Sequence, residues 1–107
     1  MGVGEYRAIN LQDILYLKSN AHFVDYYLVS GEIIHVRELI NDAESKLSEH
    51  GFARVHRQYI VNVYKIQKLN TSRYPEILLR NGKILPLGRK YKDTVALKYT
   101  ERMRNIL

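Results

Sequence analysis

Short runs of alternating apolar and polar residues dominate the chain and predict β-strands over most of its length. The runs are separated by Gly, Asn, Ser and Pro, the residues that favour turns. Ser30–Gly31 and Asn81–Gly82 each lie between two such runs, so each predicts a tight hairpin. The predicted strands are Tyr6–Ile9, Ile14–Ser19, Phe23–Val29, Glu32–Val36, Lys65–Asn70, Glu76–Arg80 and Lys83–Leu87.

Two segments instead carry apolar residues at helical spacing. Glu38–Leu47 predicts a short helix that ends at His50–Gly51. Its apolar stripe consists of Leu39, Ile40, Ala43 and Leu47. Arg89–Met103 predicts a C-terminal helix, since an apolar residue recurs at every fourth position. That stripe consists of Tyr91, Val95, Tyr99 and Met103. We therefore expect a mainly β fold of antiparallel sheets, with one short internal helix and one C-terminal helix.

The segment Phe52–Ile66 combines a strand pattern with a dense group of hydrogen-bond donors. Its apolar residues share one parity: Val55, Tyr59, Val61 and Val63. Arg57 falls on the same parity, and a long cation is costly on a buried face. We therefore expect the strand to end or turn near Arg57. Such a turn would display Arg57 beside Arg54 and His56 on a rigid support, which suits a polyanion.

The composition fits one folded domain spanning residues 1–107. Of these residues 46% are hydrophobic, which is typical of a domain with its own core. The absence of Cys excludes disulfides and thiolate metal sites. No apolar run approaches the roughly 18 residues that a membrane span needs, and nothing resembles a signal peptide. We expect a cytoplasmic protein that makes no membrane contact.

The net charge of +6 is distributed unevenly along the chain. Residues 1–50 contain four Lys and Arg against eight Asp and Glu, a balance of −4. Residues 51–107 contain 13 Lys and Arg against three Asp and Glu, a balance of +10. This segregation predicts a basic face that meets phosphate. The alternative is a merely solubilising surface, although solubility alone favours mixed signs.

Three polar clusters lie near the predicted strand ends. Their candidate binding residues are Asn20 and His22 in the first cluster, Arg54, His56 and Arg57 in the second, and Arg89, Lys90 and Lys92 in the third. The Arg fork matches guanine O6 and N7, whereas Lys acts mainly as a point charge on the DNA backbone. Asn and His can bond to base edges or phosphates.

Each cluster also has a purely structural interpretation. The Asn20–His22 segment could be only a polar turn, and His56 could be a strand histidine that donates to a carbonyl. Arg89 could complement a carboxylate or begin a solvated helix. Asn62 is more simply a turn former than a contact. Several Tyr residues fall on apolar positions, where core packing is favoured over base stacking: Tyr16, Tyr59, Tyr91 and Tyr99.

Catalytic patterns are absent from the sequence. The four His residues lack metal-ligand spacing, and there is no GxSxG, P-loop or GxGxxG motif. Asp25 could pair with His22 across a loop, but no further group completes a catalytic set. We expect no enzymatic activity, no metal and no cofactor.

The order of the motifs resembles the LytTR-type DNA-binding domain of bacterial response regulators. The similarity runs from about Ile9 to Met103. "DILYLKSNAHFV" is similar to the family's opening strand–loop–strand. "VRELINDAESKL…GFARVHRQYIVNVYKI" resembles the family's most specific block, FxRiHRSylVNlxxI, and "ILLRNGKILPLGRKYKD" resembles its closing motif. The chain departs from these patterns where Gln58 replaces Ser and Gly88 replaces Ser or Thr.

The resemblance implies an elongated arrangement of antiparallel sheets whose loops enter successive major grooves of duplex DNA. It implies a loop contact around Asn20–His22 and base contacts from Arg57 and Arg89. It also implies that His56 lies near a phosphate, with Lys90 and Lys92 as phosphate partners. Family members bind short repeats as dimers or side-by-side copies, and their usual partner within the chain is an amino-terminal receiver domain.

Two other classes remain open at this stage. An RNA or single-strand binder would use exposed Tyr residues and prefer unpaired strands. A protein-interaction module would pair an exposed β-edge with a partner, and its affinity would respond little to salt.

Overall fold

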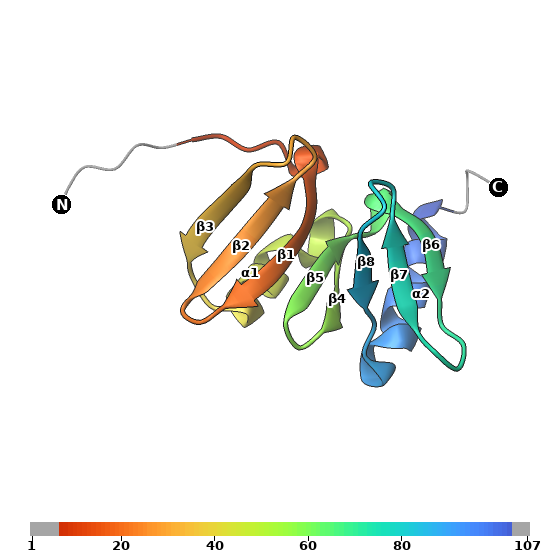
Figure 1. Cartoon of the computed structure of the whole chain (residues 1–107). Helices are drawn as coiled ribbons and strands as arrows, with labels where there is room; N and C mark the ends of the chain where they lie inside the picture. The colour runs from red at the N-terminus through yellow and green to blue at the C-terminus, as the bar shows by residue number, and fades with distance from the viewer. Residues whose placement is uncertain (1–6, 104–107) are drawn as a thin grey trace.

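Two antiparallel β-sheets and two α-helices make up residues 7–103, the part of the chain that the computed structural model describes (Figure 1). The larger sheet has the strand order β3-β2-β1-β5-β4. Its strands are β1 (Ile14–Asn20), β2 (Phe23–Leu28), β3 (Ile33–Arg37), β4 (Phe52–His56) and β5 (Tyr59–Asn62). The smaller sheet consists of β6 (Ile66–Asn70), β7 (Glu76–Leu79) and β8 (Ile84–Pro86), in that order.

The helices lie behind the sheets in the view of Figure 1, α1 (Ile40–Leu47) behind the larger sheet and α2 (Lys92–Met103) behind the smaller one. Single 3₁₀ turns join the elements: η1 (Leu11–Asp13), η2 (Ser48–His50), η3 (Val63–Lys65) and η4 (Arg89–Tyr91). The prediction of a mainly β fold with one short internal and one C-terminal helix is confirmed. The molecule is elongated, with extents of 48 × 27 × 24 Å.

Apolar side chains form two clusters. One packs α1 against the larger sheet through Ala43, Leu47 and Phe52. The other spans both sheets and α2, since Val55 and Val61 of the larger sheet share it with Ile77, Leu85 and Val95. Burial of apolar surface stabilises the fold by roughly 25 cal/mol per Å². The shared cluster therefore makes the two sheets one packed body.

The segment Phe52–Ile66 folds as its pattern predicts. β4 and β5 are antiparallel neighbours, and Arg57 lies in the turn between them. The expected core placement of the Tyr residues is also confirmed. Tyr16 is buried and stacks on Tyr27 with ring centroids 4.3 Å apart. Burial raises the pKa of Tyr16 to about 12, so its hydroxyl stays neutral at physiological pH.

Apart from shifts of one residue at strand ends, the structure differs from the sequence-based prediction at three places. Arg7–Ile9 is not a strand, because Ile9 packs as an irregular segment against the α1 cluster; Tyr6 lies outside the described residues. Leu39 was placed on the buried stripe of the first helix, yet it has extended φ and ψ angles at the N-cap and is 61% exposed. The C-terminal helix begins at Lys92 instead of Arg89, since η4 precedes it.

Asn62 has the structural role that its position suggests. Its amide Nδ2 donates to the Ile14 carbonyl over 2.9 Å and joins two strands of the larger sheet. Its Oδ1 accepts from the Tyr64 backbone N–H over 3.1 Å and caps η3. The side chain is almost completely buried, so neither bond can be replaced by bulk water.

We predict that Asn62→Ala lowers the free energy of unfolding by about 2–3 kcal/mol, because it leaves the Ile14 carbonyl and an η3 donor unsatisfied. Urea denaturation measures this change. Asn81→Ala is the matched control: Asn81 Oδ1 also accepts from a backbone N–H two residues later, but Asn81 is exposed. The control should cost less than about 1 kcal/mol, and equal losses would contradict the assigned role of burial.

Candidate nucleic-acid interface

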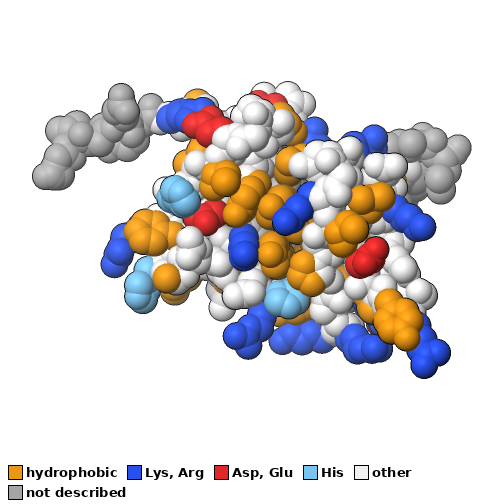
Figure 2. All heavy atoms as spheres, in the orientation of Figure 1, with side chains coloured by type: hydrophobic (Ala, Val, Ile, Leu, Met, Phe, Trp, Pro, Cys, Tyr) orange, Lys and Arg blue, Asp and Glu red, His pale blue; other side chains and the backbone are white. Residues whose placement is uncertain are grey.

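Three connections between elements meet along one edge of the molecule. They are the β1–β2 turn, the β4–β5 turn and the segment from β8 into η4, which lie at the lower edge of Figure 1. Figure 2 shows Lys and Arg side chains gathered along the same edge, with Asp and Glu side chains elsewhere on this face. All three sequence-predicted clusters therefore lie on one surface, which we call the basic edge.

Two backbone hydrogen bonds connect the three loops. The Ser19 N–H at the end of β1 donates to the Gln58 carbonyl in the β4–β5 turn over 2.9 Å. The Gly88 N–H, one residue before η4, donates to the Val55 carbonyl of β4 over 2.7 Å. These bonds do not depend on side-chain identity. They fix the order of the loops along the basic edge and limit the movement of each loop relative to its neighbours.

The β1–β2 turn presents Asn20 and His22. Ala21 between them adopts φ +56°, a left-handed conformation that is uncommon for a residue with a Cβ. Asp25 of β2 ties down the end of β1, since Asn20 Nδ2 donates to Asp25 Oδ2 over 3.2 Å. His22 is exposed. Asn20 is exposed as well, so both candidate residues of this turn are accessible.

Asp25 contacts a different histidine from the one that the sequence suggests. His35, its cross-strand neighbour on β3, approaches Asp25 Oδ1 with Nδ1 at 2.6 Å. The pairing with His22 that the sequence suggests is therefore not formed; strand register brings His35 opposite Asp25 instead. Asp25 is buried, and its two oxygens connect β3 with the tip of β1. It is a positioning residue for the first turn.

The β4–β5 turn presents His56 and Arg57. The Gln58 N–H donates to His56 Nδ1 over 3.1 Å, so a neutral His56 carries its proton on Nε2. That Nε2–H is a donor suited to a phosphate oxygen. Arg57 is exposed, and within residues 7–103 its side chain makes no hydrogen bond or ion pair with the protein. Its full fork is available for a ligand.

Arg54 differs from Arg57, although both lie in the same cluster of the sequence. Its side chain is only 11% exposed, and its guanidinium donates to Asn41 Oδ1, Glu44 Oε1 and the carbonyls of His56 and Arg57. These contacts use four of its five N–H donors. The structure thus gives Arg54 the task of joining α1 to the β4–β5 turn.

The third loop presents Arg89, Lys90 and Lys92. Arg89 is exposed and makes one long bond, from Nη2 to the Arg73 carbonyl at 3.4 Å. The Lys90 ammonium lies 5.1 Å from the centre of the Tyr91 ring. Lys92 donates to the Thr71 carbonyl over 3.4 Å. Gly88 lies close to Tyr91, since a Cβ on Gly88 would stand 3.0 Å from that ring.

Some of the basic residues in the second half of the chain do not belong to this edge. Lys98 donates to the carbonyls of Ser48 and Phe52, and burial lowers the pKa of its ammonium. Arg102 donates to the Tyr64 hydroxyl and the Glu49 carbonyl. These cations attach α2 to β4 and to the 3₁₀ turns η2 and η3. The charge carried by the three loops is therefore a better guide to an anion-binding surface than the +10 balance of residues 51–107.

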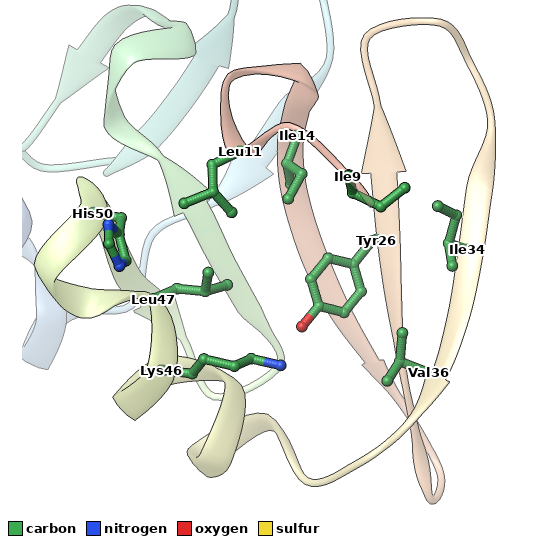
Figure 3. Close-up of a pocket in the computed structure, with 9 residues that line it drawn as sticks. All are labelled: Ile9, Leu11, Ile14, Tyr26, Ile34, Val36, Lys46, Leu47 and His50. Carbon is green, nitrogen blue, oxygen red and sulfur yellow. The ribbon is translucent and has the colours of Figure 1, made fainter. Parts of the chain in front are cut away.

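An apolar pocket of about 360 Å³ lies on the α1 side of the larger sheet (Figure 3). Ile9, Tyr26 and Leu47 line it, with Lys46 and His50 toward α1 and η2. Its lining is unsuited to phosphate. Within residues 7–103 no group of three or more acidic or His side chains forms a metal site, and no helix is long and apolar enough to span a membrane.

The sequence correctly indicated the three loops that carry the candidate residues. It did not indicate the hydrogen bonds that fix these loops relative to one another. The Ser19–Gln58 and Gly88–Val55 bonds involve backbone atoms and have no signature in residue type. The role of Asp25 depends on strand register. The only signal for Arg54 was its strand parity, which could have indicated that it points away from the free side of the turn.

Comparison with known proteins gives one family. The family model of the LytTr DNA-binding domain matches residues 4–99. Among solved structures, the LytTr DNA-binding domain of a response regulator from Bacillus cereus has a TM-score of 0.75 and 18% sequence identity, and the alignment covers 84% of each chain. At this identity the likeness concerns the fold. No curated protein matches the sequence.

We predict that Arg54→Lys lowers the free energy of unfolding by about 1–3 kcal/mol, because one ammonium cannot replace four guanidinium bonds. Urea denaturation measures this loss. Arg57→Lys is the matched control in the exposed turn, and it should change stability by less than about 0.5 kcal/mol. An Arg54→Lys protein as stable as this control would contradict the structural assignment of Arg54.

Proposed function

Because this chain belongs to the LytTR family of DNA-binding domains, we propose that its basic edge reads the sequence of duplex DNA through loops. The chain is a DNA-binding domain of the kind that response-regulator transcription regulators carry. One observation carries the finer proposal: two backbone hydrogen bonds hold three loops in a fixed order along one edge, one loop with Asn20 and His22 and two with exposed Arg or Lys side chains. A rigid array of donors can match a fixed array of groups on DNA without losing much conformational entropy.

We assign base readout to Arg57 and Arg89. Both are exposed, and neither forms an ion pair within the described residues. A free guanidinium fork fits guanine O6 and N7 in the major groove. Asn20 and His22 provide a third contact in the neighbouring groove, where the Asn20 amide and the His22 ring can bond to base edges.

We assign backbone contacts to His56, Lys90 and Lys92. His56 offers an Nε2–H donor, since its Nδ1 accepts from Gln58. Lys90 and Lys92 are cations beside Arg89 and set its register against the phosphates. Arg54 belongs to the site as a support, because its guanidinium already binds α1 and the carbonyls of the turn. Its interaction with DNA is indirect, through the shape of the β4–β5 turn.

The shape of the molecule favours reading of more than one groove. Its longest extent is 48 Å, and successive major grooves on one face of B-DNA lie about 34 Å apart. We propose that the chain acts as one domain and that two copies bind neighbouring short repeats, as dimers or side by side. Where the chain is part of a longer protein, a receiver domain would control this pairing. Linked binding raises affinity without new contacts.

Selection from a pool of randomised duplex DNA tests this proposal. The expected result is enrichment of a short repeated motif, with binding that weakens steeply as salt rises. Salt-sensitive binding without an enriched motif would contradict sequence reading and would leave only a basic surface. Preference for single strands or RNA would favour the stacking alternative, and salt-independent binding would favour a protein-interaction edge.

We predict that Arg57→Ala and Arg89→Ala each weaken binding to the selected duplex by about 1–3 kcal/mol. Each should also abolish preference at a different base position. Repeating the selection with each variant and measuring fluorescence anisotropy checks both effects. Equal losses on selected and random DNA would contradict base readout, because a lost phosphate contact weakens all sequences alike.

Lys90→Ala should weaken selected and random duplexes alike and make the slope of log affinity against log salt shallower by about 0.9. Lys83→Ala is the control, since it removes the same charge from an exposed position in the β7–β8 turn, at the opposite end of the smaller sheet. The control slope should equal that of the parent chain. An unchanged slope for Lys90→Ala would remove Lys90 from the backbone contacts.

A further inference from the structure

The loop between β6 and β7 lies at the same end of the molecule as the three loops of the basic edge (Figure 1). It contains residues 71–75, and its tip carries Arg73 and Tyr74. Neither the family's closing motif nor its central block includes these residues. We propose that this loop is a fourth DNA contact, which binds the sugar-phosphate backbone beyond the bases that Arg89 reads. The inference rests on the proposed function and extends its footprint.

Contacts with the third loop place the β6–β7 loop on the basic edge. Arg89 Nη2 donates to the Arg73 carbonyl, and Lys92 Nζ donates to the Thr71 carbonyl, each over 3.4 Å. The residue assigned to base readout and a residue assigned to phosphate binding therefore both touch this loop. A duplex lying along the basic edge and contacting Arg89 must pass close to the tip.

The loop is locally ordered and does not depend on DNA for its shape. Asn70 Oδ1 accepts from the Ser72 N–H at 2.9 Å and from the Ser72 hydroxyl at 2.6 Å. Such a turn around an Asn side chain fixes the backbone after β6. Pro75 restricts φ just before β7. The tip is thus presented with little entropy left to lose on binding.

The side chains at the tip suit a sugar-phosphate backbone. Tyr74 is 74% exposed, the largest value among the exposed large hydrophobic residues of the described chain, so its ring contributes little to packing. The Arg73 guanidinium carbon lies 5.7 Å from the centre of this ring. Arg forks bind phosphate oxygens, while a Tyr ring can pack against deoxyribose and its hydroxyl can donate to phosphate.

The acidic residue nearest in sequence does not oppose this contact. Glu76 begins β7, pairs with Asn70 and Pro86, and lines a hollow with Lys68 and Leu78 on the surface of the smaller sheet. Its side chain therefore lines a surface of the smaller sheet that also carries Lys68. In Figure 2 basic and hydrophobic side chains gather at the end of the molecule where the β6–β7 loop lies.

Affinity measured on two kinds of duplex tests the proposal. The probes are the selected duplex with about one helical turn (~10 bp) of flanking DNA on both sides, and versions in which each flank is removed in turn. Arg73→Ala should weaken binding to the long duplex about 5–20-fold and make the salt slope shallower by about 0.9. Removing the flank next to the bases that Arg89 reads should abolish the difference in affinity between Arg73→Ala and the parent chain.

Matched variants separate the loop's contact from effects on folding. Lys83→Ala removes the same charge at the other end of the smaller sheet and should leave affinity unchanged. Tyr74→Phe, which keeps the ring and removes the hydroxyl, should lose less affinity than Tyr74→Ala. Thermal unfolding should give the same midpoint for the Arg73 and Tyr74 variants as for the parent chain, because both side chains are exposed.

Three results would overturn the proposal. In the first, Arg73→Ala binds every duplex with the same affinity as Lys83→Ala. In the second, the loss of affinity caused by Arg73→Ala persists in full after removal of either flank. Tyr74→Ala could also weaken only single-stranded DNA, which would indicate base stacking instead. If the parent chain selects a motif and Arg89→Ala loses a base preference while Arg73→Ala changes nothing, the fourth contact fails and the proposed function stands. If the parent chain selects no motif, the proposed function fails first.

Discussion

The backbone hydrogen bonds from Ser19 to Gln58 and from Gly88 to Val55 are the constraint on which the proposed DNA-binding surface depends. Loops are ordinarily the mobile part of a β fold. Here each loop that carries a candidate contact is bonded to the next one by main-chain atoms. Main-chain bonds of this kind do not depend on which side chains the loops carry. The side chains proposed to contact DNA can therefore vary while the spacing between the loops stays fixed.

The proposed division between supporting cations and DNA-binding cations rests on which of their N–H donors the protein already satisfies. Arg54 and Lys98 have their donors satisfied by protein carbonyls and side chains, so withdrawing them for DNA would leave buried groups unpaired. Arg57 and Arg89 lie at exposed positions on the same framework. Neighbouring basic residues of one motif thus have different tasks, and a count of positive charges does not distinguish them. The number of N–H donors that the protein already satisfies does distinguish the supporting residues from the proposed binding residues.

Much of the fold could be predicted from the sequence because its signals are local. The conflict between Arg57 and its apolar parity correctly placed the β4–β5 turn, and Asn81–Gly82 correctly placed the β7–β8 hairpin. The prediction failed where distant residues decide the outcome. Leu39 has the right spacing for the buried stripe but lies one residue before the helix, and Asp25 meets His35 only through strand register.

The candidate site was predictable from local signals in the sequence, but not where its geometry depends on contacts between distant segments. The residue types at the three strand ends indicated a polyanion-binding edge, but pairing between β1 and β5, which are far apart in sequence, brings the first two loops together. The β6–β7 loop gave no signal beyond ordinary turn residues. Its relation to Arg89 and Lys92 appears only in the folded chain, since those contacts join segments about 20 residues apart.

The proposed reading of DNA by a rigid row of loops, which enter successive major grooves on one face of the duplex, can be tested on the DNA itself. Its most direct test is a 7-deazapurine scan, in which each purine of the selected duplex loses N7, a major-groove acceptor. If the loops read two successive grooves, binding should weaken at two blocks of positions that lie one helical turn (~10 bp) apart. Loss confined to one block, or no loss at any purine, would contradict it.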